Sequence, residues 1–190
     1  MTESGCVDAS DTRWSNLAAD LDALAEAQEA AETDAVVAEL TRAEHAATGL
    51  ASRLRAAIGV AVAVDLPDGE PVRGVVGDAA GTWLLLEAAA RSPERHLVPL
   101  AAIDGVSGLG AGSVPAPRRE IAMTTLLRDL QRDRRTLLVR TRGQVYRGRI
   151  ARVGADHLDL DVLDGRHREQ RVVPFAALLC VSDAPPGMGP

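Results

Sequence analysis

The chemistry that this chain offers most plainly is that of arginine. All 21 of its basic residues are arginine, and 14 of them lie in residues 118–190 against 9 acidic residues, a net charge of +5. Guanidinium groups bind phosphate oxygens well, so the basic half is a candidate nucleic-acid face. The candidate contacts are the three arginines whose charge is least offset by neighbouring acids, Arg132, Arg134 and Arg135. Arg140 and Arg142, from the strand predicted to follow them, complete the set.

The first 117 residues have the opposite character. They carry a net charge of −11, so the whole chain has a net charge of −6. This asymmetry fits a nucleic-acid face on the basic half, and it fits equally an attraction between the two halves or between two subunits.

A second group of chemically capable side chains lies late in the chain. It comprises four aspartates and two histidines: Asp156, His157, Asp159, Asp161, Asp164 and His167. Such a group could bind a cation, but its spacing is not that of a calcium-binding loop. Strand alternation instead predicts that Asp159 and Asp161 face Arg147 and Arg149 of the preceding strand as solvated ion pairs. We therefore expect no metal site.

The sequence lacks the arrangements that catalysis and cofactor binding usually need. The glycine-rich segment Gly108–Gly112 is followed by Pro115 and Pro117 where a phosphate-binding turn would need a helix, so we interpret it as linker. No serine lies in a nucleophile elbow, and the four histidines stand in different contexts. We expect no catalytic residue and no cofactor, and we expect that the protein is not an enzyme.

Residues 11–57 are predicted to form a long, acidic, amphipathic helix after a disordered tail over residues 1–10. No proline lies between Arg13 and Ile58, and apolar residues recur at steps of three or four. One step of five residues rotates the apolar stripe near Thr33, so a helical hairpin is the alternative to one continuous helix.

The apolar stripe of this predicted helix is narrow and rich in alanine. A helix of that length cannot bury its whole stripe on a small domain, so a partner helix is the natural cover. We therefore expect a homo-oligomer, formed as a coiled coil through residues 13–57.

An internal repeat follows the predicted helix. The segment Gly74–Leu86 matches Gly148–Leu160 at an offset of 74, and the phrase Val98–Val106 matches Val173–Val181 at an offset of 75. Each copy is predicted to form four or five short strands joined by glycine turns. Strands of that number and length suit a small closed barrel.

The second copy resembles the Sm-like proteins. Its stretch Gly148–Leu160 follows the pattern G-x-h-x-x-h-G-x-D-x-h-x-L of their first motif, where h is apolar, and Ala177–Val181 resembles the last strand motif of the bacterial members. The asparagine typical of the first motif is absent, and Phe175 and Ala176 replace the lysine–histidine pair of the second. The resemblance therefore implies the fold and not the uridine-binding site, and SH3-like barrels fit the same pattern.

The whole chain is also similar to a group of uncharacterised actinobacterial proteins with a helix followed by two barrels. Some of that group carry a Fis-type regulator label, which implies DNA binding through a helix-turn-helix. The sequence contains no helix-turn-helix pattern, so we do not carry that function over.

These observations predict an α+β, mainly β fold: a long N-terminal helix followed by two small Sm-like or SH3-like barrels. A Gly/Pro linker and a short helix are expected to join the barrels. The expected parts after the first helix are a first barrel over 58–110, a linker over 111–117, a short helix over 118–134, a second barrel over 135–183 and a disordered tail over 184–190.

The functional expectation is a non-catalytic interaction or adaptor protein that presents its two barrels to an unknown protein partner. The alternative is a nucleic-acid-binding regulator that uses the basic second barrel. The polar, acidic N-terminus lacks the pattern of a signal peptide, and the longest apolar run is too short to cross a bilayer. We therefore expect a cytoplasmic protein without a membrane partner.

Overall fold

The computed structural model describes residues 28, 39, 48–88, 94–164 and 167–184, and the chain divides into units of residues 1–48 and 49–190. Most of the helix predicted over 11–57, most of the coiled coil assigned to 13–57, the predicted tail over 1–10 and all but residue 184 of the predicted tail over 184–190 lie outside the described residues. Within the described residues the structure shows two short α-helices, α2 (Leu50–Ala56) and α3 (Met123–Arg132), and no long N-terminal helix. The predicted self-association through residues 13–57 stays a prediction.

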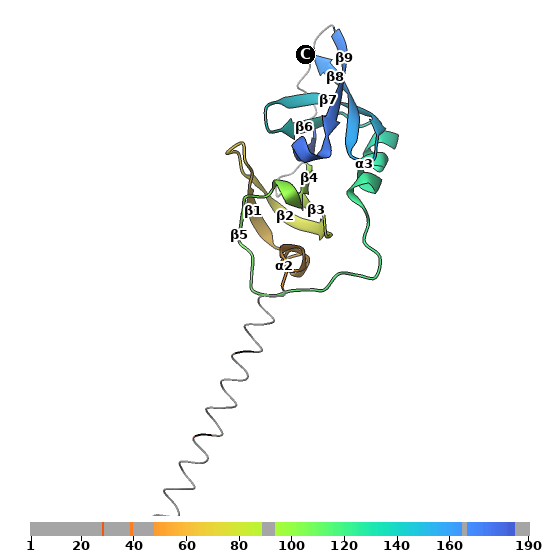
Figure 1. Ribbon diagram of the computed structural model, residues 1–190. Coiled ribbons are helices and arrows are strands. Elements are labelled where there is room, and N and C mark those ends of the chain that lie inside the picture. Colours follow the sequence, from red (N-terminus) through yellow and green to blue (C-terminus); the bar gives the residue numbers. More distant parts are fainter. Residues whose placement is uncertain (1–27, 29–38, 40–47, 89–93, 165–166, 185–190) are drawn as a thin grey trace, which may run out of the picture. The chain divides into compact units, whose positions relative to one another are not determined.

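The two sequence repeats fold into the same order of elements (Figure 1). The first repeat contains β1 (Ala61–Asp65), β2 (Val72–Ala79), β3 (Trp83–Glu87), β4 (Arg95–Pro99), the one-turn helix η1 (Leu100–Ala102) and β5 (Gly105–Ser107). The second contains β6 (Leu137–Thr141), β7 (Val145–Val153), β8 (His157–Asp164), β9 (His167–Pro174), η2 (Phe175–Ala177) and β10 (Leu178–Asp183). In both, a proline ends the fourth strand, and its fixed φ begins the one-turn helix.

All ten strands belong to one antiparallel sheet, and the prediction of two closed barrels is wrong. The strand order is β5-β1-β2-β3-β4-β10-β6-β7-β8-β9. In each repeat the fifth strand pairs with the first strand, but it does not pair with the fourth strand of its own repeat. Strand β10 of the second repeat instead pairs with β4 of the first. The backbone hydrogen-bonding groups at the edge of β4 are thus paired by a strand of the other repeat, and not by closure of each repeat into its own barrel.

The two repeats also share their hydrophobic cores. Leu179 and Cys180 of the second repeat are fully buried in the core cluster of the first repeat. Trp83 and Leu97 of the first repeat lie in the cluster built by the second repeat and α3. This exchange of core residues explains why neither repeat forms a separate barrel.

The backbone irregularities of the two repeats confirm their equivalence. The β2–β3 register shifts at Gly77, and the β7–β8 register shifts at Ala151, which is the matching residue. Gly74 and Gly148 also match, and a Cβ on either one would lie within 2.7 Å of a carbonyl oxygen of the neighbouring strand. Both glycines are therefore required by a close approach of two strands.

Replacement of Gly148 by alanine is expected to lower the free energy of unfolding by about 1–3 kcal/mol, the usual cost of overpacking. The added Cβ would collide with the carbonyl oxygen of Asp161, a backbone atom that cannot move without shifting β8. Urea denaturation followed by circular dichroism measures the change. Gly143→Ala is the matched control, because a Cβ there meets no atom within 4 Å. Equal stability of Gly148→Ala and the parent protein would contradict the close approach.

In the described ranges, no helix is long and apolar enough to cross a membrane.

Candidate functional site

A groove lined by arginines runs between α3 and β7. Helix α3 is amphipathic, with Leu127 fully buried against the second core cluster and Leu126 and Leu130 packed beside it. The opposite side of the helix therefore carries its polar residues towards solvent. The groove is lined by residues from α3, β7 and β8: Arg128, Gln131, Arg132, Arg134, Arg149, Ile150, Ala151 and Asp161.

Local structure fixes the position of the helix above the strand. The side-chain amide of Gln131 donates a hydrogen bond of 2.8 Å to the carbonyl oxygen of Ala151, the residue at the β7 bulge. The bulge interrupts the strand ladder at that residue and leaves a carbonyl that a side chain can reach. Helix α3 is thus attached to β7 by one specific contact as well as by its apolar side.

Helix α3 ends with an unusual backbone conformation in the groove. Arg134 has φ 52°, and it is the only non-glycine residue with positive φ among the residues that the structure describes. Its amide donates a 3.1 Å hydrogen bond to the carbonyl of Gln131, as the residue after a helix end commonly does. Glycine is usual at such a position because a side chain there costs about 1–2 kcal/mol.

The groove is strongly basic. Four arginines and one aspartate line it, and all five are exposed. Arg132 makes an ion pair of 2.9 Å with Asp129, while Arg149 reaches only the hydroxyl of Thr136, at 3.4 Å. Within the described part of the chain, the side chains of Arg128 and Arg134 make no hydrogen bond or ion pair. Two guanidinium groups are therefore free to bind an anion.

The structure brings only two of the five predicted nucleic-acid contacts into this groove, Arg132 and Arg134. Arg135 is paired with Asp183 at 3.1 Å. Arg142 is exposed in the turn between β6 and β7 and does not line the groove. Arg128 and Arg149 were not among the contacts predicted from the sequence. A signal for Arg128 was present, because a step of four residues places Arg128 and Arg132 on the same side of a helix.

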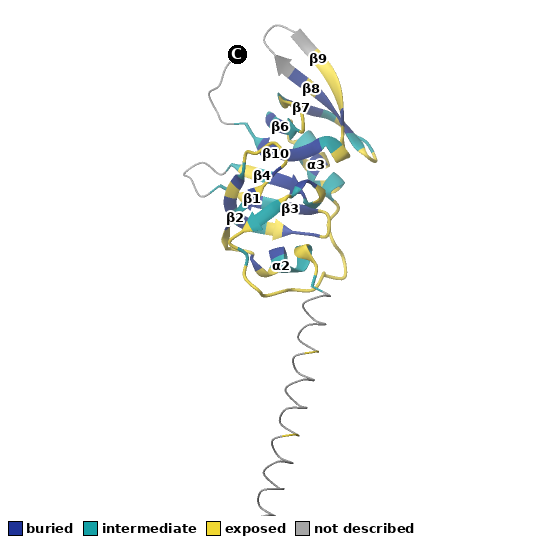
Figure 2. Cartoon of the chain, turned by 60° about the vertical axis from the view of Figure 1, so that its left-hand side comes forward, coloured by how far each residue is buried: buried dark blue, intermediate teal, exposed yellow. Residues whose placement is uncertain are grey.

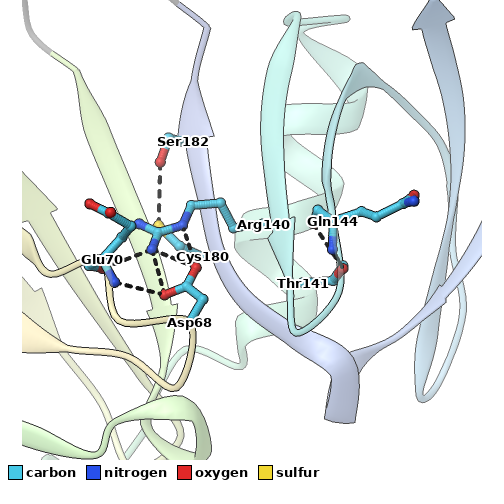
Figure 3. A network of polar contacts seen from close by, with 7 residues as sticks. All are labelled: Asp68, Glu70, Arg140, Thr141, Gln144, Cys180 and Ser182. Carbon is cyan, nitrogen blue, oxygen red and sulfur yellow. Dashed lines mark hydrogen bonds and ion pairs between the residues drawn. The ribbon is translucent and has the colours of Figure 1, made fainter.

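Arg140, the remaining predicted contact, is engaged between the two repeats. Its guanidinium donates to both carboxylate oxygens of Asp68, at 2.7 Å to Oδ1 and 2.6 Å to Oδ2, and to the carbonyl of Glu70, at 2.7 Å (Figure 3). Burial pushes the pKa of Asp68 upwards, but the hydrogen bonds and the charge of Arg140 outweigh it and leave that pKa below its ordinary value. Arg140 thus fastens β6 to the β1–β2 turn, and its charge is already neutralised.

Cys180 lies next to this contact and is fully buried. Its sulfur is 3.3 Å from the hydroxyl of Ser182, and burial raises the pKa of the thiol to about 11 (Figure 3). A thiol with so high a pKa is protonated at neutral pH and is a poor nucleophile. The second cysteine, Cys6, lies outside the described residues.

The aspartate and histidine group is built differently from the predicted pattern. Asp159 is buried, only 6% exposed, and it accepts a 2.8 Å hydrogen bond from Arg152 rather than from Arg147 or Arg149. Asp161 is directly opposite Arg149 in the β7–β8 register. Over the part of the chain that the structure describes, no group of three or more His, Cys, Asp or Glu side chains is placed to hold a metal ion.

The aromatic residues that the structure describes do not line the groove. Trp83, which matches His157 in the repeat, is buried, and its indole nitrogen donates a 2.7 Å hydrogen bond to the carbonyl of Ile121. Tyr146 has the guanidinium of Arg171 over its ring at 5.6 Å. Neither ring lines the groove, so neither can stack on a nucleic-acid base bound there.

Comparisons with known proteins do not extend this description: no family model, curated protein or solved structure matches the chain significantly.

Proposed function

We propose that the protein is a non-catalytic nucleic-acid-binding protein, and that the arginine groove between α3 and β7 holds the phosphate backbone. One observation carries this proposal: Arg128 and Arg134 are exposed, lie in one groove with Arg132 and Arg149, and have no anionic partner of their own within the described residues. Surface arginines elsewhere in the second repeat are mostly paired, as Arg135, Arg140 and Arg152 are.

The character of the groove favours a polyanion over a small metabolite. Its volume, about 760 Å³, is within the range of small-molecule sites, but such sites are mainly apolar with a few polar groups. Here the polar lining dominates, and all of its positive charge comes from guanidinium groups. Such groups bind phosphate with two hydrogen bonds each, and several in a row follow a phosphodiester chain.

The expected binding has little sequence preference. Contacts to phosphate position a nucleic acid without reading its bases, and the groove provides no aromatic ring for stacking. The acidic first 117 residues would weaken binding by repulsion, so we expect moderate affinity at low salt. A cytoplasmic location, where a buried free thiol such as Cys180 remains reduced, is part of the same proposal.

Fluorescence anisotropy of labelled RNA and DNA oligomers over a series of salt concentrations tests the proposal. Contacts from four arginines should give a plot of log affinity against log salt with a slope of about −3. Similar affinity for oligomers of unrelated sequence is expected. Absence of binding at low salt would reject the proposal and favour the alternative, an adaptor that binds a protein partner.

A further inference from the structure

The ten-stranded sheet ends in two edge strands, each with one unpaired edge. Among the described residues, β5 pairs only with β1, and β9 pairs only with β8. These two strands are the equivalents of the pair that joins the repeats inside the chain, because β5 matches β10 and β9 matches β4. The chain pairs β10 with β4 internally. The equivalents of these two strands, β5 and β9, each keep one edge free, so the same pairing could form between two chains.

The register shows which residues correspond at that junction. Val64 pairs with Val106 in the first repeat, and Val139 pairs with Val181 in the second, so Val106 corresponds to Val181. In the same way, Leu85 pairs with Leu97 and Asp159 pairs with Val172, so Val172 corresponds to Leu97. At the junction, Leu97 lies directly opposite Val181.

Burial differs sharply between these equivalent positions. Leu97 is 4% exposed and Val181 is 3% exposed, and both lie in the core cluster that includes Leu127 of α3. Val172, at the free edge, is 65% exposed, the largest exposure among the large apolar residues of the described chain, and Val106 is half-buried. Figure 2 shows the described part of β9 coloured mainly as exposed. An exposed β-branched residue on an unpaired strand edge is a ready template for another strand.

The charges at the two free ends are also complementary. The junction inside the chain is fastened by Arg140 of β6 and Asp68 of the β1–β2 turn, at 2.6 Å. By the strand registers, the residue that corresponds to Arg140 is Asp65. In the turns that follow these strands, the sequence offset of 74 that aligns Gly69 with Gly143 places Arg142 at the position of Asp68. The same ion pair would therefore form between two chains with its charges exchanged. Asp65 and Arg142 are both exposed, and neither side chain has an ion pair in the described structure.

We propose that the protein self-associates head to tail, with β9 of one chain pairing antiparallel to β5 of a second copy. The pairing repeats the register inside the chain: Val172 lies opposite Val106, and Arg142 forms an ion pair with Asp65 of the second copy. A shallow apolar groove beside β5, lined in part by Ala61, Val62 and Ser107, lies next to this edge. The contact is heterologous, so every added chain presents a new free edge until the assembly closes.

Sedimentation velocity of the full chain, from about 1 to 300 µM to cover weak strand pairing, tests the proposal. Concentration-dependent association is expected for the parent protein. Val172→Asp should remove it, because the carboxylate would be buried against Val106 without a partner. A protein that stays monomeric over this range, or association unaffected by Val172→Asp, would overturn the proposal and place any contact elsewhere.

A charge exchange identifies the partner edge. Asp65→Arg and Arg142→Asp should each weaken association about 3- to 10-fold, because each replaces attraction by repulsion between exposed groups. The double variant should recover the parent affinity, because the pair is re-formed with its charges reversed. Arg118→Asp, at an exposed arginine that belongs to neither edge strand, is the control and should have no effect. A double variant as weak as the single variants would overturn the proposed register.

Discussion

Replacing Arg128 and Arg134 together by glutamate is expected to weaken the binding of RNA and DNA oligomers at least about 30-fold. Each change removes a charge-assisted contact worth about 1.5–3 kcal/mol and adds a repelling carboxylate. Both side chains are exposed and without a polar partner in the described structure, so the fold should not change. Fluorescence anisotropy at one fixed salt concentration measures the loss, and circular dichroism checks that the variant is folded.

The matched control is Arg118→Glu with Arg119→Glu. It makes the same change in net charge at two exposed arginines that precede α3 and do not line the groove. The control should lose much less affinity than the groove variant. Equal losses in the two variants would mean that binding depends on overall charge, and the groove would no longer be the site.

Replacing Trp83 by alanine is expected to lower the free energy of unfolding by about 3–5 kcal/mol, the usual cost of removing a buried tryptophan. The side chain is 2% exposed and lies in the core cluster of the other repeat. Because the repeats share their cores, both should unfold in one transition, which chemical denaturation followed by circular dichroism would show. Val145→Ala, at an exposed valine of β7, should stay within about 0.5 kcal/mol of the parent protein.

The alternative outcome is equally specific. Two separate transitions, with Trp83→Ala affecting only the first repeat, would mean that the repeats are independent domains. The shared clusters, and the β4–β10 pairing that creates them, would then not describe the protein in solution.

The sequence predicted the local part of this fold better than its long-range part. The repeat, the glycine turns and the alternation of apolar residues depend on neighbouring positions, and the order of strands within each repeat follows from them. The pairing of β4 with β10 joins residues more than 80 positions apart, and no local pattern distinguishes it from closure of each barrel. One signal was present: Trp83 stands where the second repeat has His157, and so large an apolar side chain needs cover.

The sequence predicted the chemistry of the candidate site, but it did not predict which arginines line it. An excess of arginine over acid indicated an anion site in the basic half. Which arginines are free depends on partners far along the chain, such as Asp68, 72 positions before Arg140. Arg149 enters the groove only because α3 packs on β7, a contact that the spacing of residues does not reveal.

The site and the sheet edges use different arginines, so the two proposals can be tested separately. Arg142 belongs to the proposed contact between chains and does not line the groove. A variant that lacks self-association should therefore keep its affinity per chain for nucleic acid. Association between chains would place several grooves on one assembly, which would raise the apparent affinity for a long strand through multivalency.

The most direct test of the nucleic-acid site is a titration of ¹⁵N-labelled full-length protein with an unlabelled RNA oligomer, observed through the arginine side-chain Nε–Hε signals. Shifts concentrated at Arg128, Arg132, Arg134 and Arg149, with Arg140 and Arg152 unmoved, are the predicted result. Those two arginines are held by Asp68 and Asp159 and should not respond. Shifts centred on other arginines, with the groove signals unchanged, would contradict the account.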